Sequence, residues 1–261
     1  MREIPKDWKQ RLISIEEEVK YDDRPSSGPP FVITKGDVKN KVLFSAPHGA
    51  RSFHNSDKEI WHEEDEYTAG LAHYLHEILG THSIATIFKS DKYDPNYTGA
   101  ECNDYKRALK KYLKDNHIKY VIDLHGAALH SKKLAERQLV DLGVGGKNQT
   151  PLSIKEEKFN KIREIIETRL GENSSNRRGK GGFDAEEHDR TITNFCYQLK
   201  EKDDIDVSAI QIEMKPQIRV VKRRESATLY KSCGEFKGEE EKILETIKAL
   251  SEIADYLNGI K

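Results

Sequence analysis

The chain has 261 residues, of which 44 are basic and 45 are acidic, giving a formal net charge of -1 at pH 7. This balance gives no general attraction for nucleic acid or an anionic membrane, and no apolar run approaches the roughly 20 residues that a bilayer span needs. The polar N-terminus, Met1 to Gln10, lacks the apolar core of a signal peptide, so we expect a cytoplasmic protein with neither nucleic-acid nor membrane partners.

Short apolar runs alternate with helical patterns from residue 31 onward, and this alternation predicts an α/β fold. Only 36% of the residues are hydrophobic, so the apolar residues must be concentrated in buried strands and helix faces. Most runs are continuous, as in strands that are covered on both faces. In chain order they predict strands at Phe31 to Thr34, Lys41 to Ala46, Ser83 to Phe88, Lys119 to Leu124, Gln138 to Val144 and Val207 to Met214.

Other segments repeat apolar residues at helical spacing and predict helices that cover the sheet. These segments are Asp65 to Leu79, Tyr105 to Leu113, Ile154 to Leu170 and Glu239 to Leu257. By contrast, Gly171 to Gly182 has almost nothing to bury and predicts a mobile surface loop. Strand and helix signals continue beyond that loop, so we expect a single domain over residues 1–261.

Polar residues stand at the ends of three predicted strands, where a purely structural account does not require them. The strand ending at Ala46 runs into His48 and Gly49, and the strand ending at Leu124 runs into His125 and Gly126. Glu213 lies within an otherwise apolar run. In an open α/β sheet the carboxyl ends of the strands line the ligand crevice, so these side chains can converge.

Two histidines and an acid are the usual protein ligands of a catalytic zinc ion, which keeps a further position for water. His48 and His125 supply the imidazoles. We expect the carboxylate from the acidic run before the second predicted helix, and favour Asp65 because it falls in the first turn of that helix, with Glu64 and Glu66 as alternatives. The sequence therefore predicts a Zn2+ site, although such a ligand set also accepts other divalent ions.

Each of these residues also has a purely structural interpretation. A histidine near a strand end is more often hydrogen-bonded than metal-bound, and acids at a helix start are usually caps. Glu213 fits that interpretation poorly, because burying an unpaired carboxylate costs several kcal/mol or raises its pKa, and a raised pKa suits a general base. We expect Asp123 to orient a ligand imidazole, and the remaining histidines, including His62, to be structural or on the surface.

The order of these motifs resembles the N-formylglutamate amidohydrolase family. The resemblance spans Leu43 to Arg219 and consists of Pro47-His48-Gly49, Asp65 with Leu71 six residues on, Asp94-Pro95-Asn96, Asp123-Leu124-His125-Gly126 and Gln211-Ile212-Glu213. It implies a three-layer α/β/α fold with a mixed central sheet, like that of the zinc carboxypeptidases. It also implies that His48, Asp65 and His125 bind zinc and that Glu213 activates the attacking water.

By the same resemblance the substrate is a small N-acyl amino acid or related amide, and Asn96 and Gln211 are candidate substrate-binding residues. Family members often place an arginine after the asparagine of the Asp-x-Asn motif, but here Tyr97 follows. A carboxylate on the substrate would still need a bidentate arginine. We favour Arg190, whose segment, Phe183 to Phe195, has polar residues that suit an active-site loop, over Arg219 and Arg107.

Two rival interpretations remain open at this stage. Cell-wall amidases that cut an N-acetylmuramoyl-L-alanine bond use a similar arrangement of histidines and acids, but act outside the cytoplasm. A non-catalytic binding module on the same fold would keep the histidines for structural reasons. The sequence contains nothing that fixes an oligomeric state.

Overall fold

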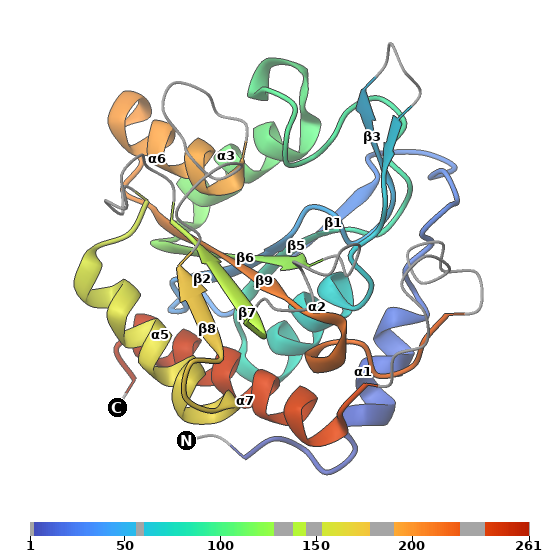
Figure 1. Cartoon of the computed structure of the whole chain (residues 1–261). Helices are drawn as coiled ribbons and strands as arrows, with labels where there is room; N and C mark the ends of the chain where they lie inside the picture. Colours follow the sequence, from blue (N-terminus) through green and yellow to red (C-terminus); the bar gives the residue numbers. More distant parts are fainter. Residues whose placement is uncertain are drawn as a thin grey trace.

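In the part of the chain that the structure describes, a seven-stranded mixed sheet runs through the centre of the molecule (Figure 1). The computed structural model describes residues 3–55, 60–127, 138–144, 153–177, 191–224 and 238–260. Four neighbouring strands are mutually parallel, the first strand is antiparallel to its neighbour, and β7 is antiparallel to β9. Across the sheet the order is β1 (Phe31–Thr34), β5 (His82–Thr86), β2 (Val42–Ala46), β6 (Tyr120–Gly126), β9 (Ser208–Met214), β7 (Val140–Gly143) and β8 (Ser175–Arg177).

All six predicted strands are present, with ends shifted by no more than two residues. The predicted loop at 171–182 is wrong in part, because Ser175–Arg177 form β8, which pairs in parallel with β7. Its polar side chains gave no strand signal, and backbone hydrogen bonds to β7 hold it at the sheet edge. Residues 178–182 lie outside the described part of the chain. A separate antiparallel ribbon of β3 (Ser52–Asn55) and β4 (Ile60–His62) was not predicted.

Helices cover both faces of the sheet, which gives three layers (Figure 1). One face carries α1 (Trp8–Glu16), α2 (Thr68–Leu79), α5 (Glu156–Leu170) and α7 (Glu240–Leu257), and the other carries α3 (Asp104–Asn116) and α6 (Ile192–Asp203). Short 3-10 turns, η2 (Ala100–Cys102) and η3 (Pro216–Ile218), precede α3 and follow β9. The sequence pattern predicted α2, α3, α5 and α7 but not α1 or α6. Within the described ranges, no helix combines the length and apolar character needed to cross a membrane.

The face under α3 and α6 changes from apolar to polar along the strands. Strand register places Leu43, Val121 and Ala209 in one row across β2, β6 and β9. Two residues further on, the row is Ser45, Asp123 and Gln211, and the next row pairs His125 with Glu213. Because residues two apart on a strand share a face, the chemistry-bearing side chains gather at the carboxyl ends of these strands.

Candidate metal centre

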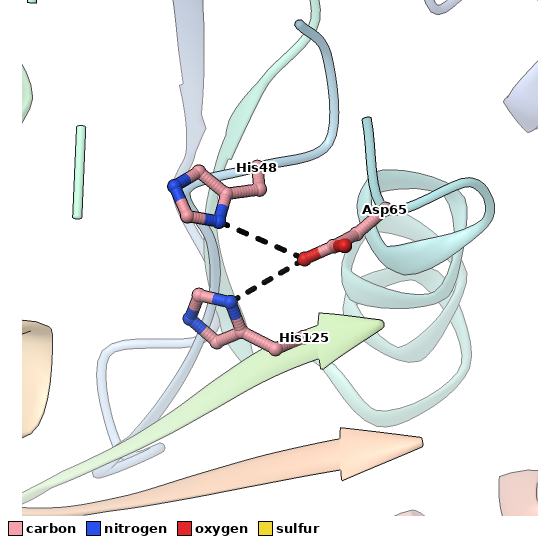
Figure 2. Close-up of side chains that lie close together, drawn as sticks. All are labelled: His48, Asp65 and His125. Carbon is pink, nitrogen blue, oxygen red and sulfur yellow. Dashed lines mark ion pairs between the residues drawn. The ribbon is translucent and has the colours of Figure 1, made fainter. Parts of the chain in front are cut away.

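Three residues that are far apart in the sequence meet at the carboxyl end of the sheet (Figure 2). His48 follows β2, His125 lies near the end of β6, and Asp65 precedes α2. Nδ1 of His48 lies 3.7 Å from Oδ2 of Asp65, and Nδ1 of His125 lies 3.4 Å from the same oxygen. All three side chains are buried, and their candidate ligand atoms lie within 4.8 Å of one another.

This spacing fits a metal ion. Two ligand atoms that each lie about 2.1 Å from a tetrahedral zinc ion are roughly 3.4 Å apart. The separations of 3.7 and 3.4 Å are close to that value. Nδ1 of His48 is buried and has no hydrogen-bond partner among the described residues, so an ion at this point would satisfy it. The donor set, two imidazoles and one carboxylate, is one that zinc accepts.

Each imidazole is oriented by a second acid at its other nitrogen. Nε2 of His48 lies 2.9 Å from Oδ1 of Asp94, and Nε2 of His125 lies 3.0 Å from Oδ2 of Asp123. A hydrogen bond from Nε2–H to a carboxylate leaves the lone pair of Nδ1 free to bind a metal. The orienting role expected for Asp123 is thus what its geometry provides. Asp94 belongs to one of the motifs, but no role could be predicted for it, because its contact with His48 spans 46 residues.

The two orienting acids are themselves fixed by hydrogen bonds. Oδ1 of Asp94 accepts the backbone N–H groups of Asn96 and Tyr97 at 2.8 and 2.9 Å. Oδ1 of Asp123 accepts the hydroxyl of Ser45 at 2.7 Å. A carboxylate held in this way keeps the imidazole at a fixed angle, so the ligand positions are prepared before any ion binds.

The centre favours positive charge. Burial lowers the pKa of His125, but the charge of Asp123 and hydrogen bonds with Asp123 and Asp65 raise it to about 10. Burial raises the pKa of Asp65, yet its hydrogen bond with His125 and the charges of His48 and His125 bring that pKa down to about 2. The acids around the imidazoles thus stabilise a cation at this point, as a divalent ion requires.

Among the three candidate acids, only Asp65 faces the imidazoles. Glu64 and Glu66 are both paired with Arg224. The prediction that Asp65 lies in the first helical turn is wrong, because α2 begins at Thr68 and Asp65 precedes it. Between them, Tyr67 adopts a left-handed conformation with φ 66°. This turn changes the direction of the chain, so Asp65 reaches the site from outside the helix. The backbone N–H of Asp65 donates to the carbonyl of His48 at 2.7 Å.

Both glycines that follow His48 and His125 are required by close packing. A methyl group at Gly49 would lie 2.5 Å from the carbonyl oxygen of Thr86 and 2.6 Å from Cβ of Ala69 in α2. At Gly126 it would lie 2.4 Å from Nη2 of Arg219 and 2.9 Å from Oδ1 of Asp65. The two His-Gly pairs therefore let the strands approach α2 and Asp65 closely.

Replacing Gly126 by alanine is expected to push Arg219 and Asp65 apart. We expect the free energy of unfolding to fall by about 1–3 kcal/mol, as for other overpacked positions, and zinc affinity to fall by about 10-fold or more. Thermal melting and chelator competition measure the two effects. Gly99→Ala is the matched control, because the three atoms nearest to its methyl group would all belong to the carboxylate of Glu101, an exposed residue that can move away. Unchanged zinc affinity in Gly126→Ala would contradict the packing argument.

Glu213 lies on β9, directly beside the strand that carries His125. Its register partner on β6 is His125, and its partner on β7 is Asp141. Gln211 Nε2 lies 3.3 Å from Oε1 of Glu213. The predicted base is thus next to the metal centre and on the same face of the sheet, and its catalytic role stays a prediction.

The predicted substrate-binding residues lie in different environments. Asn96 is fully buried, and its Oδ1 accepts the N–H of Ile192 at the start of α6. Arg219 is also fully buried: Nε donates to the carbonyl of Met214 at 3.2 Å, and Nη1 donates to that of Glu66. Both therefore have structural contacts, and their roles toward a substrate stay predictions, as does that of Gln211.

Two of the candidate arginines lie away from the described centre or outside the described chain. Arg190 lies outside the described residues, and its role in holding a substrate carboxylate stays a prediction. Arg107 lies on the surface of α3 and pairs with Asp104. The segment around Arg190 was interpreted as an active-site loop through Phe195, but residues from Ile192 onward belong to α6, which Thr191 caps by accepting the N–H of Asn194.

Two further rings border the centre. The ring of His62, in β4, stacks on that of His48 with centroids 3.7 Å apart and planes at 25°. The ring of Tyr97 lies 5.8 Å from that of His48 and 6.1 Å from that of His62. Burial lowers the pKa of His62 to about 4, which favours a neutral ring beside the centre. The expectation for His62 is a structural or surface residue, and the unpredicted β3–β4 ribbon brings its ring beside His48.

Comparisons with known proteins give similarity of fold only. No model of a known protein family matches the chain, and no curated protein matches its sequence. Similar solved structures include a metallo-carboxypeptidase from Pseudomonas aeruginosa, which is 14% identical with a TM-score of 0.47 over 99% of this chain and 70% of that chain. Pyroglutamyl peptidase I from Bacillus amyloliquefaciens is 13% identical, with a TM-score of 0.44 over 85% of this chain and 96% of that chain. A zinc aminopeptidase from Bacillus subtilis is 10% identical, with a TM-score of 0.45 over 87% and 49%. The chain is thus distantly similar to carboxypeptidase-like and pyroglutamyl peptidase folds.

Proposed function

We propose that this protein is a zinc-dependent amidohydrolase that cleaves a small N-acyl amino acid, such as an N-formyl amino acid, or a related amide. One observation carries the proposal: both buried imidazoles turn Nδ1 toward the same oxygen of Asp65 while a separate carboxylate holds each Nε2. A structural histidine needs one such partner. Two oriented imidazoles that share an acid are the arrangement of a metal site.

The roles of the residues follow from their positions. His48, Asp65 and His125 would hold the ion, which when bound polarises an amide carbonyl and makes water more acidic. Glu213, beside His125, would take a proton from the attacking water and pass it to the departing nitrogen. Water and amide are thereby converted into a carboxylic acid and an amine. Asp94 and Asp123 keep the imidazoles in place throughout.

The narrower assignment, to N-formyl substrates, rests on the order of the motifs from Pro47 to Glu213. The hydrogen bond between Asp94 and Nε2 of His48 supports it, because this contact places the Asp94-Pro95-Asn96 motif beside the proposed metal site. A substrate of this class is a small soluble molecule, consistent with the expected cytoplasmic location.

Metal analysis and a substrate panel test the proposal. We expect nearly one zinc ion per chain and release of formate from N-formylglutamate or of another acid from a related N-acyl amino acid. Labelled peptidoglycan and unblocked dipeptides serve as the comparison substrates. Dye release from peptidoglycan, with no turnover of N-acyl amino acids, would instead support a cell-wall amidase. A protein without metal or hydrolase activity would contradict the proposal.

A further inference from the structure

The residues on either side of Asp65 are held by one arginine. Glu64 and Glu66 are each 1% exposed, and the guanidinium of Arg224 pairs with both carboxylates. Its Nη2 donates to Oε1 of Glu64, and its Nε lies 3.3 Å from Oε1 of Glu66. The guanidinium carbon lies 3.6 Å from the centre of the Tyr21 ring. Arg224 is thus fixed by two acids at its edge and by an aromatic face, a geometry that lysine cannot reproduce.

Two other arginines hold the same short segment. Nη1 of Arg219 donates to the backbone carbonyl of Glu66, so Glu66 is held through its backbone as well as its side chain. Nε of Arg51, in the loop after His48, lies 3.6 Å from Oε2 of Glu64. The position of Glu64 is therefore linked to the loop that carries the first ligand histidine.

These contacts matter because no helix or strand fixes the segment. Residues 63–67 connect β4 to α2 and lie outside both elements. Side-chain contacts therefore replace the regular backbone ladder in deciding where each residue points. Arg224 occupies the carboxylates of Glu64 and Glu66, whereas the carboxylate of Asp65, between them, faces the Nδ1 atoms of His48 and His125.

We propose that Arg224 is a positioning residue for the metal centre, which aims the carboxylate of Asp65 at His48 and His125 by gripping both neighbours of Asp65. This inference rests on the proposed metal site but goes beyond it, since Arg224 touches neither imidazole. Without Arg224, Glu64 and Glu66 would be buried beside Asp65 with less positive charge to balance them, and repulsion among the three acids would favour rearrangement of the segment.

The test compares zinc affinity in Arg224→Ala, Arg224→Lys and Glu66→Gln with that of the wild type. Chelator competition on purified full-length protein gives the dissociation constant, and visible absorption of the Co2+-loaded protein reports whether the coordination geometry changes. We expect affinity to fall by about 10-fold to 100-fold in Arg224→Ala, as for other residues that orient metal ligands. A smaller loss of zinc affinity is expected in Arg224→Lys and Glu66→Gln, which keep part of the contacts between residue 224 and the two acids. These two variants also test the positioning role if Arg224→Ala does not fold.

Arg169→Ala is the matched control for lost ion pairs. Arg169 is similarly buried and pairs with Glu245 and Glu252, two acids of α7. We expect this variant to lower the melting temperature while leaving zinc affinity and the Co2+ spectrum unchanged. Wild-type zinc affinity in Arg224→Ala and Arg224→Lys would overturn the positioning role alone. Absence of zinc binding in the wild type would overturn the metal site and the positioning role together.

Discussion

Alanine in place of His48 or His125 is expected to lower zinc affinity by at least about 100-fold and to abolish hydrolysis. Residues that only orient a ligand change affinity by about 10-fold to 100-fold, so loss of a ligand itself should cost at least as much. Each substitution also leaves an orienting acid, Asp94 or Asp123, buried without its imidazole. Elemental analysis after dialysis, with chelator competition, measures the loss.

His73→Ala is the control for this pair of variants. His73 lies on α2, is half-buried, and has Nδ1 3.1 Å from the hydroxyl of Ser83, well outside the metal centre. We expect it to retain zinc and activity even if its melting temperature falls. Zinc content unchanged in both His48→Ala and His125→Ala would mean that the buried imidazoles serve the fold and that the protein is not a metalloenzyme of the proposed kind.

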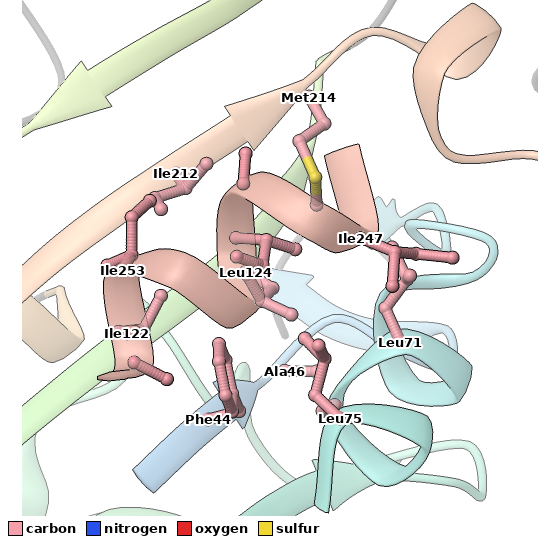
Figure 3. Close-up of a cluster of buried hydrophobic side chains, with 14 of the residues drawn as sticks. Phe44, Ala46, Leu71, Leu75, Ile122, Leu124, Ile212, Met214, Ile247 and Ile253 are labelled. Carbon is pink, nitrogen blue, oxygen red and sulfur yellow. The ribbon is translucent and has the colours of Figure 1, made fainter. Parts of the chain in front are cut away.

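The strands could be predicted because the sheet is covered on both faces. Phe44, Ile122 and Ile212 pack under α2 and α7, where they meet Leu75 and Ile253 (Figure 3). Leu43 and Val121, which precede Phe44 and Ile122 in the sequence, pack under α3 and α6, so the apolar runs there are continuous and stand out in a polar chain. The strands β3, β4 and β8 are only three or four residues long and contain no continuous apolar run, so they gave no such signal and were missed.

The convergence of the ligand histidines could be predicted for a related reason. Carboxyl ends of parallel strands meet at one edge of a sheet, and β2 and β6 turn out to be adjacent and parallel. Asp65 does face both imidazoles, but the reason for choosing it is wrong, since the residue lies before the helix. Its direction depends on the left-handed Tyr67 and on Arg224, contacts that local spacing does not encode.

The orienting contacts could be predicted only where they are local. Asp123 lies two residues from His125 on the same face of a strand, so its role follows from strand geometry. Asp94 reaches His48 across 46 residues, and Arg224 reaches Glu64 across 160. Neither separation matches the short spacing that brings residues together on one helix or strand. A single sequence therefore gives no reason to pair these residues before the fold is known.

Glutamine in place of Glu213 is expected to leave zinc affinity unchanged and to lower kcat by at least about 100-fold, because it keeps the size of the side chain but cannot accept the proton. Position favours Glu213 over its neighbour Asp141. Strands in a sheet are about 4.8 Å apart, so Glu213 starts one strand spacing from His125, whereas Asp141 starts about 10 Å away. The register of β6, β9 and β7 fixes that order.

Asp141→Asn is the control that distinguishes the two candidate bases. Asp141 and Glu213 lie on the same face of the sheet, and each substitution removes one negative charge. We expect Asp141→Asn to keep kcat within about 10-fold of the wild type, since general base catalysis by Glu213 would remain intact. Measuring kcat over a range of pH in both variants distinguishes a lost base from a displaced substrate, which would raise KM instead. A normal kcat in Glu213→Gln, together with a low kcat in Asp141→Asn, would identify Asp141 on β7 as the base instead. Normal rates in both would place proton transfer on a residue outside this sheet row, because the two carboxylates are the acidic members of the row that begins at His125.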